Sequence, residues 1–489
     1  MDRFLFQFAQ SHEEFRIPEL ESIASLYGFE LDFEGNRDYT RPFMVIRLAH
    51  QEHARLLARR CILIKSVHEF YAQGSTYEEL HANNRNARPL WEKYVPDTSF
   101  KFEISGFNHT IPKARQRDVV ESFGYMDMLG KIDLKNPEIV MTVYEECALR
   151  LSLIINVDKR RDDTPRDRLE GDGNFIQVYF GRLVQEGSAR LLIHKFDVKK
   201  RAFFGNTSME AEISLLMANQ TLASSGKLMY DPFMGTGSMA YPVAHFGAMM
   251  IGSDIDGRQM RGKGSPSCRR SSSPVLTTSI GQTPGVYRAA EQYGVAQRIM
   301  DLCTFDMTWN PWRRGGLFDA IVTDPPYGVR AGAKRLGRKK EMTEERKALH
   351  FERQAALQEA GHRSYIPPTK PYELSELARD LVLYARWLLK PEGRLVFFLP
   401  TVNEQYQEVD VQSMLCPGMG LVANSLQDFG AWGRRLITVR KTSHDEFPPP
   451  DFLARAPPSD AGAPAHKDFR EKYFEGFKKG DEKSASSKT

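Results

Sequence analysis

Apolar residues in the N-terminal part of the chain alternate between the two-residue spacing of strands and the longer spacing of helices. The order of these patterns is strand, helix, strand, strand, helix, strand, which is the ferredoxin-like plan. We therefore predict a small α+β domain over residues 1–73. The predicted strands are residues 4–8, 29–33, 43–48 and 61–70, and the predicted helices are residues 18–27 and 52–60.

A second α+β segment follows, over residues 74–200. Its apolar runs are strand-like, with one amphipathic helix between the first two, and it contains no group of side chains typical of catalysis. We expect this segment to bind or position a partner. The predicted strands are residues 100–104, 140–144, 175–180 and 189–196, and the predicted helix is residues 114–128.

From residue 201 to 442 strands and helices alternate regularly, which predicts an α/β domain with a mostly parallel, doubly wound sheet. Thr207-Ser-Met-Glu210 has the spacing of a capping box before the first helix. The predicted strands are residues 227–230, 248–253, 298–305, 318–322, 394–399, 421–425 and 435–439.

Three segments depart from this plan. Residues 331–371 are polar and charged, with one weak helix predicted around residues 341–359. Residues 264–284 are rich in Ser, Thr and Gly, and we expect a surface insertion there. Residues 443–489 are rich in Pro and charge, which predicts a mostly disordered tail.

Composition narrows the class of protein. The 489 residues are 41% hydrophobic and 27% charged, and no apolar run approaches the ~20 residues of a membrane span. The five cysteines are far apart and form no CxxC pair, which argues against a disulfide framework or a zinc site within the chain. The N-terminus lacks a secretory pattern, so we expect a cytoplasmic protein.

A glycine turn lies between the first α/β strand and its helix, in the segment Asp231-Pro-Phe233-Met-Gly235-Thr-Gly237-Ser. Such a turn lets the backbone approach a ligand closely, and Asp254, at the end of the next strand, is placed to hold ribose hydroxyls. The third glycine of the dinucleotide fingerprint is absent. The pattern favours a nucleoside ligand without pyrophosphate, such as S-adenosylmethionine.

Three further polar residues are candidates for the same ligand. Asp306 follows the third strand, where it can receive an adenine amino group or serve as a turn cap. Asp256 competes with Asp254 for the ribose, but we expect it to begin the following helix. Thr207 precedes the first strand and can reach the methionine carboxylate in addition to capping a helix.

The tetrapeptide Asp324-Pro325-Pro326-Tyr327 ends a buried strand. An exocyclic amine or amide nitrogen is a poor nucleophile because its lone pair is delocalised. The Asp324 carboxylate and the Pro325 carbonyl can hold both N–H groups out of plane and free that lone pair, while Tyr327 stacks on the ring. An Asp-Pro turn that closes a strand is the structural alternative.

Two basic clusters flank this machinery. Residues 330–340 contain six basic side chains and no acid, and residues 258–270 contain five and no acid. Solvated loops often have this composition, but their position beside the candidate site favours a polyanionic substrate.

The order and spacing of these elements favour a class I methyltransferase. The residues alone leave open which amine is methylated: adenine N6, guanine N2 or glutamine N5. A non-catalytic RNA-binding scaffold with a degenerate methyltransferase domain is the alternative from another class. The large N-terminal module counts against glutamine methylation. The intact acids Asp231, Asp254 and Asp324 count against the non-catalytic scaffold.

The chain resembles the catalytic subunit of tRNA (guanine-10-N2) methyltransferase. The resemblance is carried by Thr207-Ser-Met, the glycine turn, Gly252-Ser-Asp-Ile-Asp256, Thr323-Asp-Pro-Pro-Tyr-Gly328 and a His466-Lys-Asp-Phe-Arg tail. It implies an N-terminal ferredoxin-like plus THUMP module that captures tRNA, with residues 74–200, and residues 178–182 within them, as the THUMP portion. It also implies S-adenosylmethionine as methyl donor and a small zinc-binding activator subunit as partner.

Overall fold

The computed structural model describes residues 1–148, 174–262, 268–270, 285–327, 332–337, 343, 346, 348–349, 351–352, 368–407, 411–430 and 432–452. The chain divides into two compact units, Met1–Arg190 and Leu191–Thr489. Among the described helices, none combines the length and the apolar character that a membrane crossing requires.

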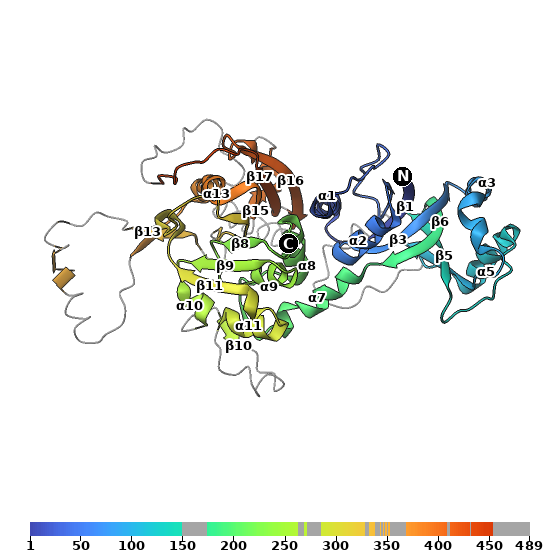
Figure 1. Ribbon diagram of the computed structural model, residues 1–489, viewed down its shortest axis with the longest axis horizontal. Helices are drawn as coiled ribbons and strands as arrows, with labels where there is room; N and C mark the ends of the chain where they lie inside the picture. The colour runs from blue at the N-terminus through green and yellow to red at the C-terminus, as the bar shows by residue number, and fades with distance from the viewer. Residues whose placement is uncertain are drawn as a thin grey trace, which may run out of the picture. The chain divides into compact units, whose positions relative to one another are not determined.

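The N-terminal unit is built on one six-stranded sheet with the order β2-β1-β3-β6-β5-β4 (Figure 1). Its neighbours pair antiparallel except β4 and β5, which are parallel. The strands are β1 (Asp2–Phe8), β2 (Phe43–Leu48), β3 (Ile64–Gly74), β4 (Phe100–Phe107), β5 (Ile139–Cys147) and β6 (Phe175–Glu186). The helices are α1 (Arg16–Tyr27), α2 (Gln51–Arg60), α3 (Tyr77–Asn86), α4 (Arg88–Trp91) and α5 (Lys113–Ser122).

The strand β3 joins the two halves of this sheet. It pairs with β1 on one side and with β6 on the other, and most of its residues are buried. The predicted domain boundary at residue 73 falls at the end of β3, inside a continuous sheet. The division of this unit into two domains stays a prediction.

Two of the predicted N-terminal strands are wrong. Over residues 29–33 the structure has only an isolated bridge between Asp32 and Arg47, and Phe29 stacks on His53 with ring centroids 4.2 Å apart. Over residues 189–196 it has the helical turn η5 (Ser188–Arg190) followed by α7 (Leu191–Lys195). In each run only part of the apolar residues is buried, Phe33 in the first and Ala189 and Phe196 in the second. Periodicity does not distinguish such segments from strands in short runs.

The C-terminal unit contains a seven-stranded sheet with the order β11-β9-β8-β12-β15-β17-β16. Strands from β11 to β15 pair in parallel, and β17 runs antiparallel to both of its neighbours. These strands are β8 (Leu228–Asp231), β9 (Met249–Asp254), β11 (Ile299–Thr304), β12 (Phe318–Thr323), β15 (Leu389–Val402), β16 (Met419–Asp428) and β17 (Trp432–Lys441). The predicted doubly wound, mostly parallel architecture is confirmed.

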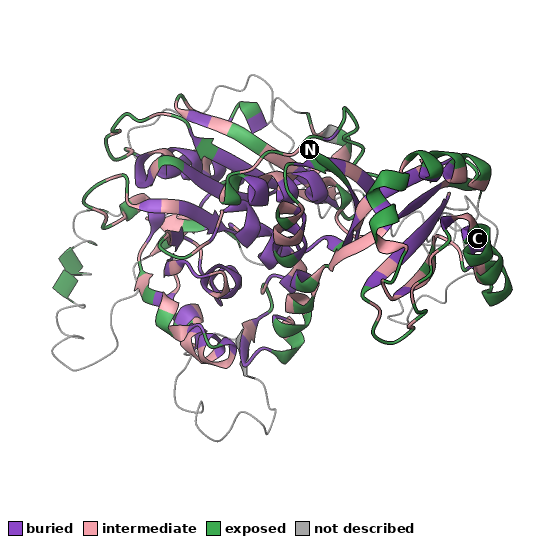
Figure 2. Ribbon diagram, turned by 45° about the vertical axis from the view of Figure 1, so that its right-hand side comes forward, coloured by how far each residue is buried: buried purple, intermediate pink, exposed green. Residues whose placement is uncertain are grey.

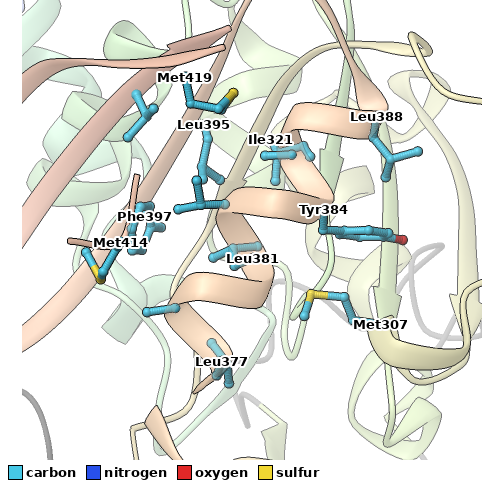
Figure 3. Packing of buried hydrophobic residues seen from close by; sticks show 14 of the residues in the cluster. Met307, Ile321, Leu377, Leu381, Tyr384, Leu388, Leu395, Phe397, Met414 and Met419 are labelled. Carbon is cyan, nitrogen blue, oxygen red and sulfur yellow. The ribbon is translucent and has the colours of Figure 1, made fainter. Parts of the chain in front are cut away.

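Two faces of this sheet are covered by helices. On one face, Leu381 of α13 (Leu374–Leu388) is completely buried in the hydrophobic cluster that includes Phe397 of β15 (Figure 3). Ile437 of β17 belongs to the same cluster. On the other face, Gln220 of α8 (Ala211–Gln220) accepts hydrogen bonds from Arg394 and Thr438. The central strands are accordingly buried on both sides (Figure 2), as expected for a parallel sheet. The remaining helices are α9 (Ala240–His245), α10 (Gly257–Arg261) and α11 (Val286–Tyr293).

The segment before α8 (Ala211–Gln220) differs from the predicted capping box. The N-cap residue is Glu210, whose side chain makes no capping hydrogen bond. Ser208 instead accepts a hydrogen bond from the Gly205 amide and contacts Thr236 Oγ1 at 2.8 Å. The residues of the box thus connect the segment of β7 (Phe203–Gly205) to the glycine turn.

Short strand pairs complete the described part of the unit. Within the predicted insertion 264–284, only β10 (Cys268–Arg270) is described, and it pairs antiparallel with β7. The strands β13 (Lys334–Leu336) and β14 (Thr369–Pro371) form a second pair. The rest of the insertion, and the tail from residue 453 on, lie outside the described residues.

Candidate active site

The predicted acids converge on one edge of the C-terminal sheet. Asp231 ends β8 and Asp254 ends β9, while Asp324 directly follows β12. β8 lies between β9 and β12 in the sheet. In parallel α/β sheets, ligands bind at the carboxyl ends of neighbouring strands, so strand order brings these three residues to one place.

The glycine turn after β8 has the backbone that its sequence predicts. Gly235 and Gly237 adopt positive φ angles of 49° and 81°, a region that other residues enter only at a cost. A Cβ at Gly237 would lie 3.0 Å from both Tyr241 Oη and Val286 Cγ1. The backbone angle and these close contacts both favour glycine at position 237.

Asp254 fastens this turn to the neighbouring strand. Its Oδ2 accepts a hydrogen bond from the Gly235 amide at 2.9 Å, and its Oδ1 accepts one from the Asp256 amide at 2.8 Å. Burial raises the pKa of Asp254 to about 6. Each oxygen keeps a lone pair for a further donor, so the carboxylate can receive ribose hydroxyls without releasing the turn.

Asp256 occupies a different place, as expected. It is the N-cap of α10 and its carboxylate contacts Arg258 at 2.8 Å. A hydrogen bond from Arg258 lowers its pKa. The predicted preference for Asp254 as ribose ligand fits this geometry, and the role itself stays a prediction.

Asp231 is a buried carboxylate that connects the ends of β8 and β12. It is 2% exposed, and its Oδ1 accepts hydrogen bonds from Thr323 Oγ1 at 2.7 Å and from the Phe233 amide at 2.9 Å. Burial raises its pKa to about 7, opposed by these hydrogen bonds and reinforced by the charges of Asp254 and Asp324. Three acids held so close together are costly unless a ligand uses them.

Asp324 has the least satisfied carboxylate of the three. Its Oδ1 is buried, and no donor in the described part of the chain bonds to it. Burial raises the pKa of Asp324 to about 6, opposed by the charge of Arg434. A buried acceptor without a partner costs about 1–3 kcal/mol. Next to it, Pro325 is buried, while Pro326 and Tyr327 are partly exposed.

Asp306 and Thr207 are placed less directly for a ligand. Asp306 is 3% exposed, and its two oxygens accept hydrogen bonds from the backbone amides of Thr308 and Leu336. An adenine amino group would share this carboxylate with β13. Thr207 lies exposed in the turn between β7 and α8. Both cofactor roles stay predictions.

The basic loop after the tetrapeptide is only partly described. Arg335 forms an ion pair with Glu376 at 3.1 Å and lies over the ring of Tyr372 at 4.9 Å. This arginine is therefore engaged within the protein, and the expected contact of the run 330–340 with a polyanionic substrate stays a prediction. Lys334 is exposed. Arg330 and residues 338–340 lie outside the described residues.

Several supporting residues were not found from the sequence. The buried Arg201 donates a hydrogen bond to Ser238 Oγ at 2.9 Å and lies 5.0 Å from the ring centroid of Tyr241. Tyr241 in turn donates to the Thr236 carbonyl at 2.7 Å. Ser238 follows the glycine turn and could have been considered on that ground. Arg201 stands outside every motif and gives no such signal.

These observations define the class of the protein. The strand order, the reversed β17, the glycine turn after β8 and the acid at the end of β9 together make a class I methyltransferase fold. Among the described residues, no group of three or more His, Cys, Asp or Glu side chains is arranged to hold a metal ion.

Comparison with known proteins identifies the family. The model described as Tmrp11 THUMP N-terminal domain matches residues 2–166, and that described as RMKL-like, methyltransferase domain matches residues 199–347. The tRNA (guanine(10)-N(2))-methyltransferase of Saccharomyces cerevisiae is 34% identical over 98% of this chain and 100% of its own length. The enzyme TRMT11 of the same description from Homo sapiens is 32% identical over 98% and 96%, respectively.

The chain therefore belongs to the tRNA (guanine(10)-N(2))-methyltransferase family, as the resemblance predicted. Among solved structures, TrmN from Thermus thermophilus covers 90% of this chain and 99% of its own, with 17% identity and a TM-score of 0.39.

Proposed function

We propose that this protein methylates the exocyclic N2 amine of a guanosine in tRNA, at position 10 by its family. The observation that carries the proposal is the buried, unpartnered Oδ1 of Asp324 at the carboxyl end of β12. An amine N–H is a donor that this oxygen can accept. The neighbouring Pro325 has a fixed φ that sets the direction of its carbonyl.

The described residues fit S-adenosylmethionine, which supplies a methyl group already activated on a sulfonium. The turn with Gly235 and Gly237 has the positive φ angles of a backbone that can approach a ligand closely, and Asp254 has free lone pairs for ribose hydroxyls. Asp231 holds the turn in place through the Phe233 amide. Asp306 and Thr207 are further candidate contacts, for adenine and the methionine carboxylate.

The chain's own contribution is to position the amine and to remove its proton. Asp324 accepts one N–H, the Pro325 carbonyl accepts the other, and Tyr327 stacks on the base. As the new bond to nitrogen forms, the amine loses a proton, which Asp324 takes directly or through water. Because a group with a pKa of about 6 is ionised at neutral pH, Asp324 is ready for this role.

Guanine N2 lies in the minor groove of a duplex, so the nucleotide must leave its stem or the stem must distort. The N-terminal unit, with its match to a THUMP model, is the part that would hold the tRNA. We further propose a cytoplasmic location and a small zinc-binding activator subunit as partner. The activator subunit follows from the family resemblance described above, and the location from the scattered cysteines, which form no CxxC pair.

Replacement of Asp324 tests the catalytic assignment. We expect Asp324→Ala to lower single-turnover methyl transfer by about 10²–10⁴-fold, with tRNA affinity measured by fluorescence anisotropy unchanged. Asp319→Asn is the matched control, because Asp319 lies on the same strand but its carboxylate holds the Leu228 amide and Lys390. Wild-type activity in Asp324→Ala would remove the basis of the proposal.

A substrate change tests which amine reacts. Unmodified tRNA is incubated with labelled methyl donor, with and without the activator subunit, and its nucleosides are analysed. We expect N2-methylguanosine, and no product from a tRNA with inosine at position 10, which lacks the N2 amine. Methylated adenosine in the product, or a label in protein that resists nuclease, would replace the guanine assignment by one of the alternatives.

A further inference from the structure

One face of the sheet continues past the candidate catalytic residue. Val322 of β12 pairs with Val396 of β15, which pairs with Thr438 of β17. Because side chains alternate along a strand, the next pair on this face toward the active edge is Phe398 with Leu436, and the pair after it is Pro400 with Arg434. Asp324 directly follows β12, two residues after Val322. Arg434 thus lies on the same face as Asp324, one pair farther along it, with its guanidinium over the ring of Phe398.

Arg434 is held firmly in this position. Its guanidinium lies 4.4 Å from the ring centroid of Phe398, and its side chain is 11% exposed. Its Nε donates to Gln427 Oε1 at 2.6 Å, and it forms an ion pair with Glu210 at 3.2 Å. Gln427 also donates to Glu210 at 2.8 Å. Stacking and bidentate bonding restrict an arginine far more than a surface ion pair does.

The described residues near Asp324 include both an acid and a cation. Asp231, from β8, is an acid that interacts with Asp324, and β15 contributes the uncharged Phe398. β17 contributes Arg434, the described cation whose charge favours the ionised form of Asp324. Glu210, at the start of α8, offsets part of the Arg434 charge, but its side chain is 54% exposed and therefore screened by solvent.

We propose that Arg434 is a positioning residue that keeps the Asp324 carboxylate ionised and able to accept the substrate amine. The inference depends on the proposed function, since it assigns the partner of the same acid. Gln427 and Glu210 keep the guanidinium against Phe398, so that its charge acts on Asp324 without a direct bond. Asp324 Oδ1 therefore remains free for the substrate.

Arg434→Met tests this role through the pH profile of methyl transfer at saturating tRNA. Methionine can pack on Phe398, and loss of the charge should move the acid limb up by about one pH unit. If the limb moves from about 6 to 7, the rate falls by about fivefold at pH 6 and by only roughly a tenth at pH 8. Arg434→Lys should restore most of the wild-type limb.

Two further variants sharpen the test. Glu210→Gln removes the acid that offsets Arg434 while keeping an acceptor, so its acid limb should move in the opposite direction, to lower pH. Arg435→Met is the matched control, because Arg435 is the next residue of β17 and its guanidinium lies 3.5 Å from the ring centroid of Tyr406, on the other face. Its acid limb should coincide with that of the wild type.

The outcomes separate this inference from the proposed function. An equal rate loss at every pH in Arg434→Met, or a loss confined to the KM for tRNA, would overturn the role of Arg434, while an inactive Asp324→Ala would still support the catalytic role of Asp324. An active Asp324→Ala would instead overturn the function from which the inference starts.

Discussion

The buried carboxylate of Asp231 should make the folded protein less stable as the pH rises. An ordinary aspartate has a pKa of 3.8, whereas that of Asp231 is about 7 because of burial. Since one pKa unit corresponds to about 1.4 kcal/mol, ionising Asp231 in the folded state costs on the order of 4 kcal/mol. Asp231→Asn removes this cost and keeps an oxygen that accepts from Thr323 and the Phe233 amide.

The sign follows from proton binding. Between pH 3.8 and about 7 the folded state holds a proton on Asp231 that the unfolded state has lost, so wild-type stability falls as pH rises through this window. The advantage of Asp231→Asn should therefore be absent near pH 4, grow with pH and level off above about pH 7. At pH 8 we expect its melting temperature to be roughly 5–10 °C higher.

Differential scanning calorimetry of the full chain from pH 5 to 8.5 measures this difference. In the wild type, the transition of the unit Leu191–Thr489 is identified by its shift on addition of S-adenosylmethionine. Asp301→Asn, a change at an exposed acid of β11, is the control. A variant less stable than the wild type at pH 8, or an advantage that does not change with pH, would refute the reasoning. We expect titration calorimetry to show weaker cofactor binding, since stability gained at a functional site usually costs function.

Two further changes probe the turn and the core. Gly237→Ala should weaken S-adenosylmethionine binding at least tenfold, as measured by calorimetry, because the added Cβ brings backbone strain of about 1–2 kcal/mol and close contacts with Tyr241 and Val286. Gly226→Ala is the control, since Gly226 has a similar φ of +84° but nothing within 4 Å of the added Cβ. Equal effects of the two changes would contradict the steric part of this prediction. Leu381→Ala should lower the free energy of unfolding by about 2–5 kcal/mol in urea, because Leu381 is completely buried; a loss under 1 kcal/mol would show that the core around α13 closes over the gap.

Local patterns predicted most of the α/β unit. The strands that end at Asp254 and before Asp324 lie within a residue of their predicted positions, 248–253 and 318–322. These elements succeed because each has a strong periodicity and ends at a Gly, Pro or Asp signal. The short apolar runs at 29–33 and 189–196 lack such support, and there the strand predictions are wrong.

The supporting contacts of the site were beyond prediction from the sequence. The ion pair of Arg434 with Glu210 joins residues 224 positions apart, and the hydrogen bond of Thr323 to Asp231 joins residues 92 apart. Neither residue type nor spacing marks such pairs. Ser208 and Thr236 likewise meet because of the path of the chain before α8, where the sequence suggested only a cap.

The sequence by itself determined which groups carry the chemistry: a glycine turn, an acid at the end of the next strand, and Asp324-Pro-Pro-Tyr327 after a buried strand. These are local features, and they can be recognised in the sequence because glycine and proline have distinctive backbone conformations. Only the tertiary structure decided which groups meet. Strand order places β8 between β9 and β12, and strand register places Arg434 on the face of Asp324. The alternation of side chains along a strand shows which of its residues share a face, but it does not show which strand lies beside it or in which register.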